Sequence, residues 1–262
     1  MRLSQCTLEV LLPHLLISSS NATIEKHDKM WVATSMLIRF LNSFTNSLVV
    51  LEKEFPVGVL GGTELLREFS KNPTFDFFNQ TSVSDVMNKE LYSVTRNTKL
   101  FDLLKQMKIS GRDFALIQNE VGSFSTISTR RLLEIGILCN TNRKVSEIQQ
   151  KKIITFTKQD KIGYVISEMI KNHVDVLVLK DTPLFITSKI ILEKIQNELS
   201  YLHNVDNFLD YKMDHFKLDN AKIISSNVTI PEMCKVMLNM KQPFIMTRNQ
   251  VLTPCDLITA LR

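Results

Sequence analysis

Between residues 83 and 133 the spacing of apolar side chains changes from that of a strand to that of a helix and back. Residues 91–95 alternate apolar and polar side chains, which is typical of a half-buried strand. The next apolar side chains recur at helical spacing and would share one face: Leu100, Leu103, Leu104 and Met107. Two short apolar segments, 114–117 and 124–127, are predicted as strands, and a second helix is predicted after Ser128. The predicted order is β-α-β-β-α.

Polar residues and a glycine mark the limits of the first of these helices. Asn97 or Thr98 offers a side-chain oxygen that can accept from the free amides of a first helical turn. Gly111 follows the last apolar position, where a residue with positive φ commonly ends a helix. We therefore expect a helix that starts near residue 98 and stops at residue 111.

The same order of elements recurs three more times. A close copy covers residues 145–195 and has its first strand at 153–157. The last copy is expected to have a strand at 222–225, a helix at 230–240 and a strand at 243–246. The first and weakest copy is expected to have a strand at 16–18, a helix at 31–44 and a strand at 47–51. The third strands end at positions that lie 59 to 67 residues apart: Gly61, Ser128, Thr187 and Thr253. Such self-similarity indicates a chain built from four repeated modules.

Composition supports a folded α/β protein and disfavours several other classes. The chain has 262 residues, of which 44% are hydrophobic, and only seven glycines and seven prolines, so long disordered segments are not expected. The formal net charge of +5 is spread along the sequence, which disfavours nucleic-acid binding. No run of 18 apolar residues predicts a membrane span. The four separated cysteines predict reduced thiols and a cytoplasmic location.

Three features outside the repeat pattern have plainer predictions. Residues 1–15 are expected to form an amphipathic lead-in helix on the first module, because Glu9 and His14 interrupt a stretch that otherwise imitates a secretion signal. Trp31, the only tryptophan, is expected to be a packing residue. The connector at 197–219 contains residues of metal-ligand type: His203, Asp206, Asp210, Asp214 and His215. They form no recognised metal motif, so a helical connector without a metal is expected.

The sequence carries no catalytic motif and no glycine-rich nucleotide loop of a known type. Its repeated chemical feature is a small hydroxyl side chain at a strand end, directly before a helix. The first amides of a helix are unpaired, so a Ser or Thr there can join them in donating to a phosphate. A carboxylate three residues later can accept from both hydroxyls of a ribose. The pattern therefore favours a binding protein and not an enzyme.

Two phrases give the repeat a resemblance to the CBS domain family, named for cystathionine β-synthase. The run Val83, Ser84, Asp85, Val86 and Met87 matches the opening phrase of that family. In the fourth copy, Leu252, Thr253, Asp256 and Leu257 match its closing phrase. The resemblance implies an α/β (α+β) fold of CBS modules, each a small three-stranded sheet with two helices. It also implies two tandem pairs that pack pseudo-symmetrically into a flat disc.

The modules are expected at residues 1–76, 78–141, 142–200 and 205–262, the first being degenerate. A single module would leave apolar helix faces exposed, such as that of Leu100 and Leu103 and that of Val165, Ile166, Met169 and Ile170. Pairing of modules through these faces is therefore expected. An intrachain pseudo-dimer and a homodimer of two chains would both satisfy this requirement.

The resemblance implies that paired modules bind an adenosine nucleotide (AMP, ADP or ATP) in the cleft between them. In the fourth module it places Thr253 at a phosphate and Asp256 at the ribose, with four residues flanking the base: Ile223, Ile224, Pro243 and Phe244. The alternative is that Thr253 only caps the last helix and that Asp256 only neutralises its positive end.

The other three modules depart from this pattern. Thr187 is kept in the third, but Ile190 stands at the acidic position. Ser128 in the second is followed by Arg131, whose guanidinium would favour an additional phosphate. Gly61 in the first lacks the hydroxyl, although Glu64 keeps a carboxylate. One complete site in four indicates a degenerate set.

These features predict a regulatory, ligand-sensing protein that transmits a conformational change to an unidentified protein effector. The nucleotide would be a regulatory ligand, and no cofactor, metal or membrane is required. The alternative is a structural or protein-interaction scaffold whose ligand sites have mostly decayed, which the residues at Gly61, Arg131 and Ile190 favour. Nucleic-acid binding would need a clustered basic face that the sequence does not show.

Overall fold

The computed structural model describes residues 5–11, 22–40, 46–118, 124–149, 153–198, 208–240, 242–247 and 250–260. Module 1 consists of β1 (Thr23–Glu25), α2 (Met30–Phe40), β2 (Ser47–Glu52), β3 (Phe55–Gly61) and α3 (Gly62–Lys71). Module 2 consists of β4 (Ser93–Val94), α6 (Leu100–Ser110), β5 (Phe114–Gln118), β6 (Phe124–Ser128) and α7 (Thr129–Leu138). Both modules have the predicted β-α-β-β-α order.

The second half of the chain repeats this arrangement. Module 3 consists of β7 (Thr155–Phe156), α8 (Ile162–Asn172), β8 (Val176–Leu179), β9 (Leu184–Thr187) and α9 (Ser188–Glu198). Module 4 consists of β11 (Lys222–Ile223), α10 (Ile230–Leu238), β12 (Ile245–Met246), β13 (Val251–Leu252) and α11 (Pro254–Thr259). In every module the first strand pairs parallel with the second, and the second pairs antiparallel with the third. β10 (Asp219–Asn220) adds a fourth, antiparallel strand at β9 of module 3.

Short elements connect or flank the modules: α1 (Leu8–Leu11), α4 (Phe75–Gln80), α5 (Val83–Val86), η2 (Val145–Glu147), η3 (Phe208–Asp210) and η4 (Met213–His215). The part of the connector that is described packs inward, since Phe208, Met213 and Phe216 belong to an apolar core. Among the helices described, none is long and apolar enough to cross a bilayer.

The helices join alternate modules. Helices α2 and α3 of module 1 contact α8 and α9 of module 3, and their apolar faces share one core. Helices α6 and α7 of module 2 contact α10 and α11 of module 4 around a second core. The faces predicted to need cover are therefore covered within the chain, as in the intrachain alternative. A homodimer stays a prediction.

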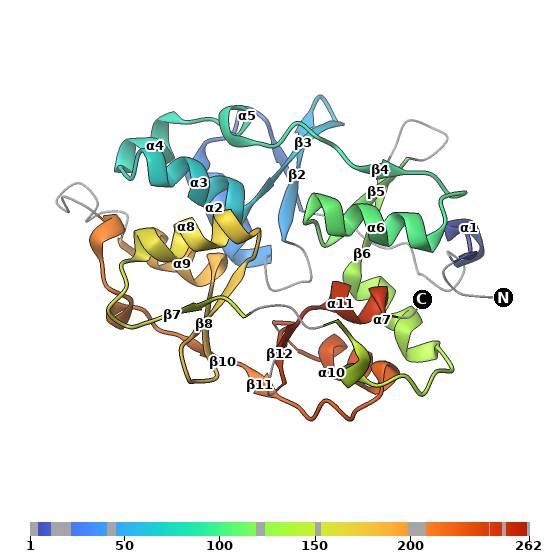
Figure 1. The fold of residues 1–262 in the computed structure, drawn as a ribbon. Coiled ribbons are helices and arrows are strands. Elements are labelled where there is room, and N and C mark those ends of the chain that lie inside the picture. The colour runs from blue at the N-terminus through green and yellow to red at the C-terminus, as the bar shows by residue number, and fades with distance from the viewer. Residues whose placement is uncertain are drawn as a thin grey trace.

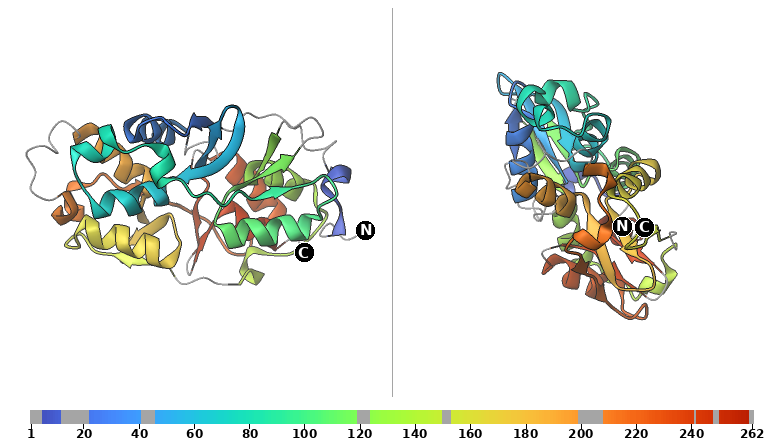
Figure 2. Two further views of the ribbon diagram at one scale, coloured as in Figure 1. Left: turned by 90° about the horizontal axis from the view of Figure 1, so that it is seen from above. Right: turned by 90° about the vertical axis from the view of Figure 1, so that its left-hand side faces the viewer.

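Neighbouring modules along the chain meet through their sheets. Val49 and Val59 of module 1 pack against Phe114 and Leu116 of module 2. Phe185 of module 3 and Phe244 of module 4 lie edge to face, with ring centroids 5.6 Å apart. The four modules occupy four quadrants of a body that is flattened along the viewing direction of Figure 1, as the turned views of Figure 2 show. The predicted flat disc of four β-α-β-β-α modules is confirmed.

Several local predictions differ from the structure. The segment predicted as the first strand, 16–18, lies outside the described residues, and the first strand of module 1 is β1, which pairs with β2. Helix α6 has Lys99 at its N-cap and no side-chain cap, because Thr98 accepts instead from the amide of Thr95 (3.1 Å). Gly111 ends α6 with φ 65°, as predicted.

Two predictions about packing at the start of the chain are wrong. The lead-in helix α1 lies on module 2 and not on module 1. The amide of Leu8 donates to the carbonyl of Thr98 (2.9 Å), and that of Leu100 donates to the carbonyl of Cys6 (2.9 Å). Trp31 is 52% exposed, because the apolar stripe of α2 is formed by Met30, Ala33 and Leu37.

Candidate functional site

One cavity, of about 280 Å³, lies where all four modules meet. Each module contributes the residue that directly precedes or leads into its second strand: Asn46, Asp113, Asp175 and Pro243. The strand registers explain this convergence, because the next residues, Ser47, Phe114 and Val176, each pair with the end of the third strand of their own module. Four equivalent positions of a repeat are thus brought to the centre of the disc.

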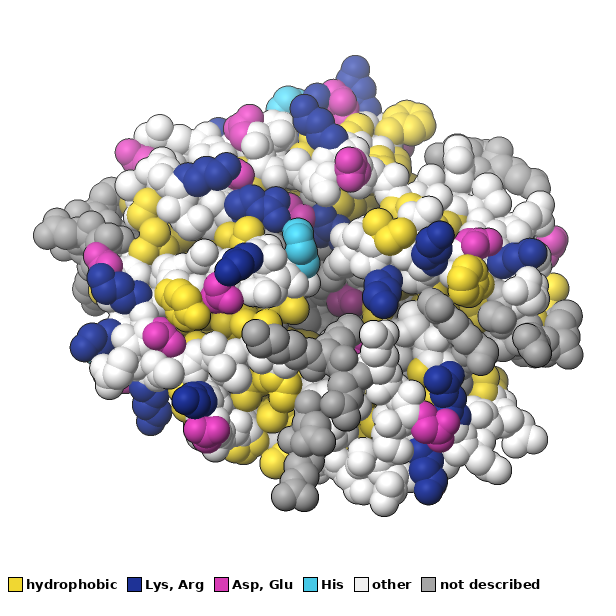
Figure 3. All heavy atoms as spheres, viewed as in Figure 1, with side chains coloured by type: hydrophobic (Ala, Val, Ile, Leu, Met, Phe, Trp, Pro, Cys, Tyr) yellow, Lys and Arg dark blue, Asp and Glu magenta, His cyan; other side chains and the backbone are white. Residues whose placement is uncertain are grey.

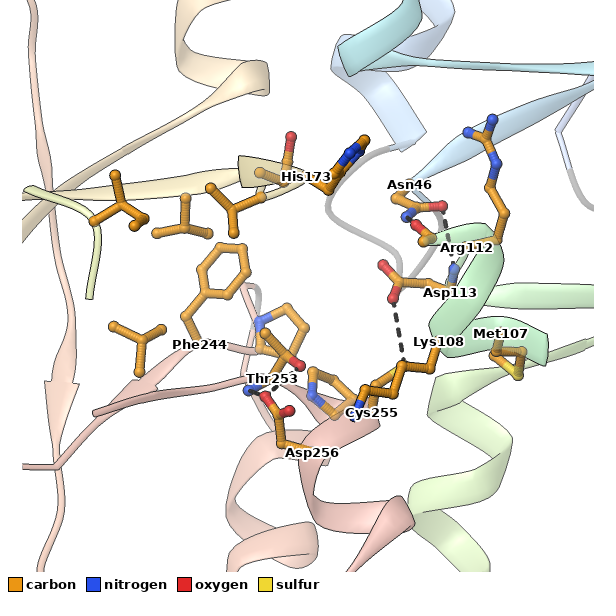
Figure 4. Close-up of a pocket in the computed structure, with 18 of the residues that line it drawn as sticks. Asn46, Met107, Lys108, Arg112, Asp113, His173, Phe244, Thr253, Cys255 and Asp256 are labelled. Carbon is orange, nitrogen blue, oxygen red and sulfur yellow. Dashed lines mark hydrogen bonds between the residues drawn. The ribbon is translucent and has the colours of Figure 1, made fainter. Parts of the chain in front are cut away.

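The wall of the cavity on the side of modules 3 and 4 is apolar. It is formed by Ile153, Ile154, Val174, Val176, Val178, Pro243 and Phe244. The ring of Phe244 points into the space between β8 and the start of α11 (Figure 4). A wall of this kind can accept the flat face of a base or another apolar group.

Thr253 and Asp256 lie at the rim where α11 begins. The amide and the hydroxyl of Thr253 both donate to Oδ2 of Asp256, at 2.9 and 2.8 Å. Asp256 is 7% exposed and still lines the cavity. The capping arrangement is therefore present, and it holds the carboxylate in a fixed position beside the cavity. This local geometry is compatible both with ligand binding by Thr253 and Asp256 and with a role limited to the start of the helix.

Asp113 and Asp175 also line the cavity, and Figure 4 shows the carboxyl group of Asp113 directed into it. Burial, followed by the charges of Asp175 and Asp256, raises the pKa of Asp113 to about 7, although Arg112 and Cys255 act in the opposite direction. Burial also raises the pKa of Asp175 to about 6, and the charge of Glu64 adds to this effect. Near neutral pH the cavity therefore binds or releases protons.

Hydrogen bonds from module 1 hold Asp113 in place. Oδ1 of Asn46 accepts from the amide of Asp113 (3.3 Å), and Nδ2 of Asn46 donates to the carbonyl of Gly111 (3.0 Å). The thiol of Cys255 approaches Oδ1 of Asp113 at 3.9 Å. Sequence reasoning missed Asn46, Asp113 and Asp175. The signal that could have found them is their shared position before the second strand of each module.

The basic groups at the cavity are at its edge or turned away from it. Lys108 and His173 line the cavity and are exposed. Arg112 lines it with its stem, but Figure 4 shows its guanidinium directed away, toward module 1. On the face seen in Figure 3, basic and acidic side chains are interspersed, with no broad area of one sign. This face thus offers no basic patch for nucleic acid.

The residues predicted to flank the base are divided between two places. Pro243 and Phe244 line the central cavity, together with Thr253 and Asp256. Ile223 and Ile224 do not. They line a second cleft, of about 830 Å³, between modules 3 and 4, and Ile223 is 64% exposed. Two apolar residues that directly precede β7 of module 3, Ile153 and Ile154, line the central cavity instead.

The remaining predicted site residues lie away from the central cavity. Thr187 is 2% exposed, and its hydroxyl accepts from the amide of Ile190 (3.3 Å) as a helix cap. Arg131 donates to both carboxylate oxygens of Glu134 at 2.9 Å, and Ser128 precedes the same helix. Glu64 is paired with Arg112. Thr187, Arg131 and Glu64 are therefore engaged in contacts within the protein.

Among the residues described, no group of three or more His, Cys, Asp or Glu side chains could hold a metal ion. His203 and Asp206 of the connector lie outside the described residues.

Comparison with known proteins finds similarity of fold. No family model and no curated protein matches the chain. A protein of Methanocaldococcus jannaschii, described as a proposed archaeal homologue of γ-AMPK, has a TM-score of 0.79 and 13% identity, over 96% of this chain and 99% of its own. An uncharacterized conserved protein of Pyrococcus horikoshii has a TM-score of 0.56 and 10% identity, over 94% and 97%. A CBS-domain protein of Agrobacterium tumefaciens covers 47% of this chain, with a TM-score of 0.39. The four-module CBS fold is shown.

Proposed function

We propose that this chain of four CBS-fold modules is a regulatory protein that binds an adenosine nucleotide in the central cavity and transmits the binding to a protein effector. One observation carries the proposal: Asp256, at the start of α11, and an apolar wall line the same cavity, to which all four modules contribute. A cytoplasmic location and the absence of catalysis belong to the same proposal.

The proposed binding mode follows from the groups at the cavity. Asp256 accepts hydrogen bonds from the ribose hydroxyls, and its contacts with Thr253 fix the position of the carboxylate. The base lies between Phe244 and the aliphatic side chains of Ile153 and Ile154. A volume of about 280 Å³ is near the lower limit of small-molecule pockets, which favours one mononucleotide over a dinucleotide.

The phosphate is the part that the cavity accommodates least easily. Asp113, Asp175 and Asp256 would repel it when all three are ionised. The raised pKa of Asp113, about 7, leaves that carboxyl partly protonated near neutral pH, so it can donate a hydrogen bond to a phosphate oxygen. Lys108 supplies a cationic group at the edge of the cavity, and the ring nitrogens of His173, also at the edge, offer a further hydrogen-bonding group.

Regulation would arise from the position of the site. A ligand that touches Asn46, Asp113, Asp175 and Pro243 contacts every module at once. If it prefers one arrangement of the modules, its differential affinity shifts the population toward that arrangement. The fold shared with the proposed γ-AMPK homologue from M. jannaschii supports this role.

The alternative function is that of a scaffold with decayed sites. Specific contacts favour it in three modules, where Thr187 caps a helix, Arg131 pairs with Glu134 and Glu64 pairs with Arg112. Among the third-strand ends that the structure describes, only that of the fourth module, at Thr253, lines the central cavity.

Thermal unfolding with AMP, ADP or ATP separates the two functions. A sensor gains about 2.7 kcal/mol at a ligand concentration one hundred times Kd, whereas a scaffold gains nothing. Asp256→Asn should abolish the gain. Glu232→Gln is the matched control, because Thr229 donates to Glu232 through its amide and hydroxyl in the same way, at 3.0 and 2.7 Å, on a helix outside the cavity. Absence of stabilisation by every nucleotide at millimolar concentration would favour the scaffold.

A further inference from the structure

Arg112 of module 2 reaches across the module boundary into module 1. Its Nη2 contacts Oε1 of Glu64 at 2.5 Å, and its Nη1 contacts Oε2 of Glu64 at 3.1 Å and Oγ of Ser47 at 2.7 Å. Arg112 is 8% exposed. Two parallel contacts to one carboxylate make this a fork-shaped pair, the strongest geometry for an arginine.

Glu64 occupies in module 1 the place of Asp256 in module 4. Oε2 of Glu64 accepts from the amide of Gly61 at 2.9 Å, just as Oδ2 of Asp256 accepts from the amide of Thr253 at 2.9 Å. A Cβ atom added to Gly61 would lie 3.0 Å from Nη1 of Arg112 and 2.7 Å from Oε2 of Glu64. The guanidinium therefore fills the space beside the strand end, at the acid where a ribose would bind.

An apolar cluster also lies at the interface between modules 1 and 2. Val49 and Val59 of module 1 pack against Phe114 and Leu116 of module 2. Arg112 lies in the turn between α6 and β5, two residues before Phe114, so the turn supplies the cation at the carboxylate and β5 supplies apolar side chains of module 2 between the sheets. Glu64 is held ionised, because the charge and hydrogen bonds of Arg112 outweigh its burial and lower its pKa.

We propose that Arg112 is a built-in occupant of the site of module 1, which keeps modules 1 and 2 closed on each other without ligand and confines nucleotide binding to the central cavity. The confinement of nucleotide binding to the central cavity rests on the proposed function. The occupation of the module 1 site by Arg112 and the closure of modules 1 and 2 are independent of any ligand. Arg112 therefore determines which module can bind a nucleotide.

Amide hydrogen exchange of the whole chain tests the occupant directly. Arg112→Ala should speed exchange at the start of α3 and of β2 by about tenfold or more, since the contacts to Glu64 and Ser47 are lost. Millimolar methylguanidinium should reverse part of that change. Arg131→Ala is the matched control, because Arg131 is also paired with a glutamate but within a single helix. Unchanged exchange in Arg112→Ala, or no effect of methylguanidinium, would overturn the proposal.

Arg112→Lys serves if Arg112→Ala does not fold. It keeps the charge but not the forked contact, so exchange near Gly61 should still rise several-fold. In the wild-type chain, AMP should slow exchange in α11 and leave the residues around Gly61 and Glu64 unchanged. Slowing at Gly61 would overturn the proposal. If AMP slows exchange nowhere, the proposed function fails, while the result for Arg112→Ala still decides the role of the arginine.

Discussion

Two carboxylates of module 4, those of Glu232 and Asp256, accept the same pair of hydrogen bonds but lie in different surroundings. Thr229 and Glu232 form it at the exposed start of α10, and Thr253 and Asp256 form it at the start of α11 beside the cavity. A local sequence pattern that specifies a helix cap is thus indistinguishable from one that presents a carboxylate to a ligand. Burial and neighbours make the difference, and these belong to the tertiary structure.

Asp113 provides a prediction about stability and pH. Its folded pKa, about 7, lies above that of an unfolded aspartate, so folding takes up a proton between these values and stability falls as pH rises from about 4 to 7. Asp113→Asn should therefore raise the free energy of unfolding by about 1–2 kcal/mol at pH 8 and have little effect at pH 4. Urea unfolding at both values checks this. A loss of stability at pH 8 would contradict it.

The same titration should affect ligand binding. AMP is expected to bind roughly three- to tenfold more tightly at pH 6.5 than at pH 8, because protonation of Asp113 removes a like charge from the cavity. Calorimetry at the two values measures the ratio. In Asp113→Asn most of the pH dependence should disappear, and an unchanged dependence would assign it to another group.

At the scale of the element, two equivalent helices end in the same conformation with different residues. Helix α6 ends at Gly111 with φ 65°, and α8 ends at His173 with φ 52°. Only glycine adopts such values without a steric cost from Cβ. The glycine was recognisable from the sequence, whereas the left-handed histidine was not.

Substitutions of Gly111 and His173 should change the free energy of unfolding in opposite directions. Gly111→Ala should lower the free energy of unfolding by about 1 kcal/mol. The cost comes from the positive φ of residue 111 and not from a clash, because an added Cβ would meet no atom within 4 Å. His173→Gly should raise it by up to about 1 kcal/mol. Chemical denaturation of both variants gives the comparison. Equal effects of the same sign would rule out this backbone explanation.

At the scale of the whole molecule, the order of the modules in the chain differs from the order of their helix contacts. Modules 1 and 3 share one helical core, and modules 2 and 4 share the other. Each half of the chain therefore contributes to both cores. A ligand bound at the centre would therefore affect both cores, because each module shares its core with a module from the other half of the chain.

This arrangement predicts how the chain behaves when it is divided. Fragments 1–141 and 142–262 should each expose two apolar helix faces and should associate or aggregate when produced alone. Produced together, they should form a 1:1 complex with the elution volume of the intact chain. Size-exclusion chromatography of the separate and joint products checks this, and two stable, non-associating monomers would contradict it.

The sequence by itself determined the β-α-β-β-α unit, its four copies and the position of Thr253 and Asp256 at the start of the last helix, where they can pair. These depend on apolar periodicity and on hydrogen bonds between residues three positions apart, which a short segment encodes. The tertiary structure alone decided which modules share a core, that Ile153 and Ile154 replace Ile223 and Ile224 at the cavity, and that Arg112 reaches Glu64. Such contacts join residues far apart in the chain, and their partners are fixed only when whole apolar faces are buried against each other.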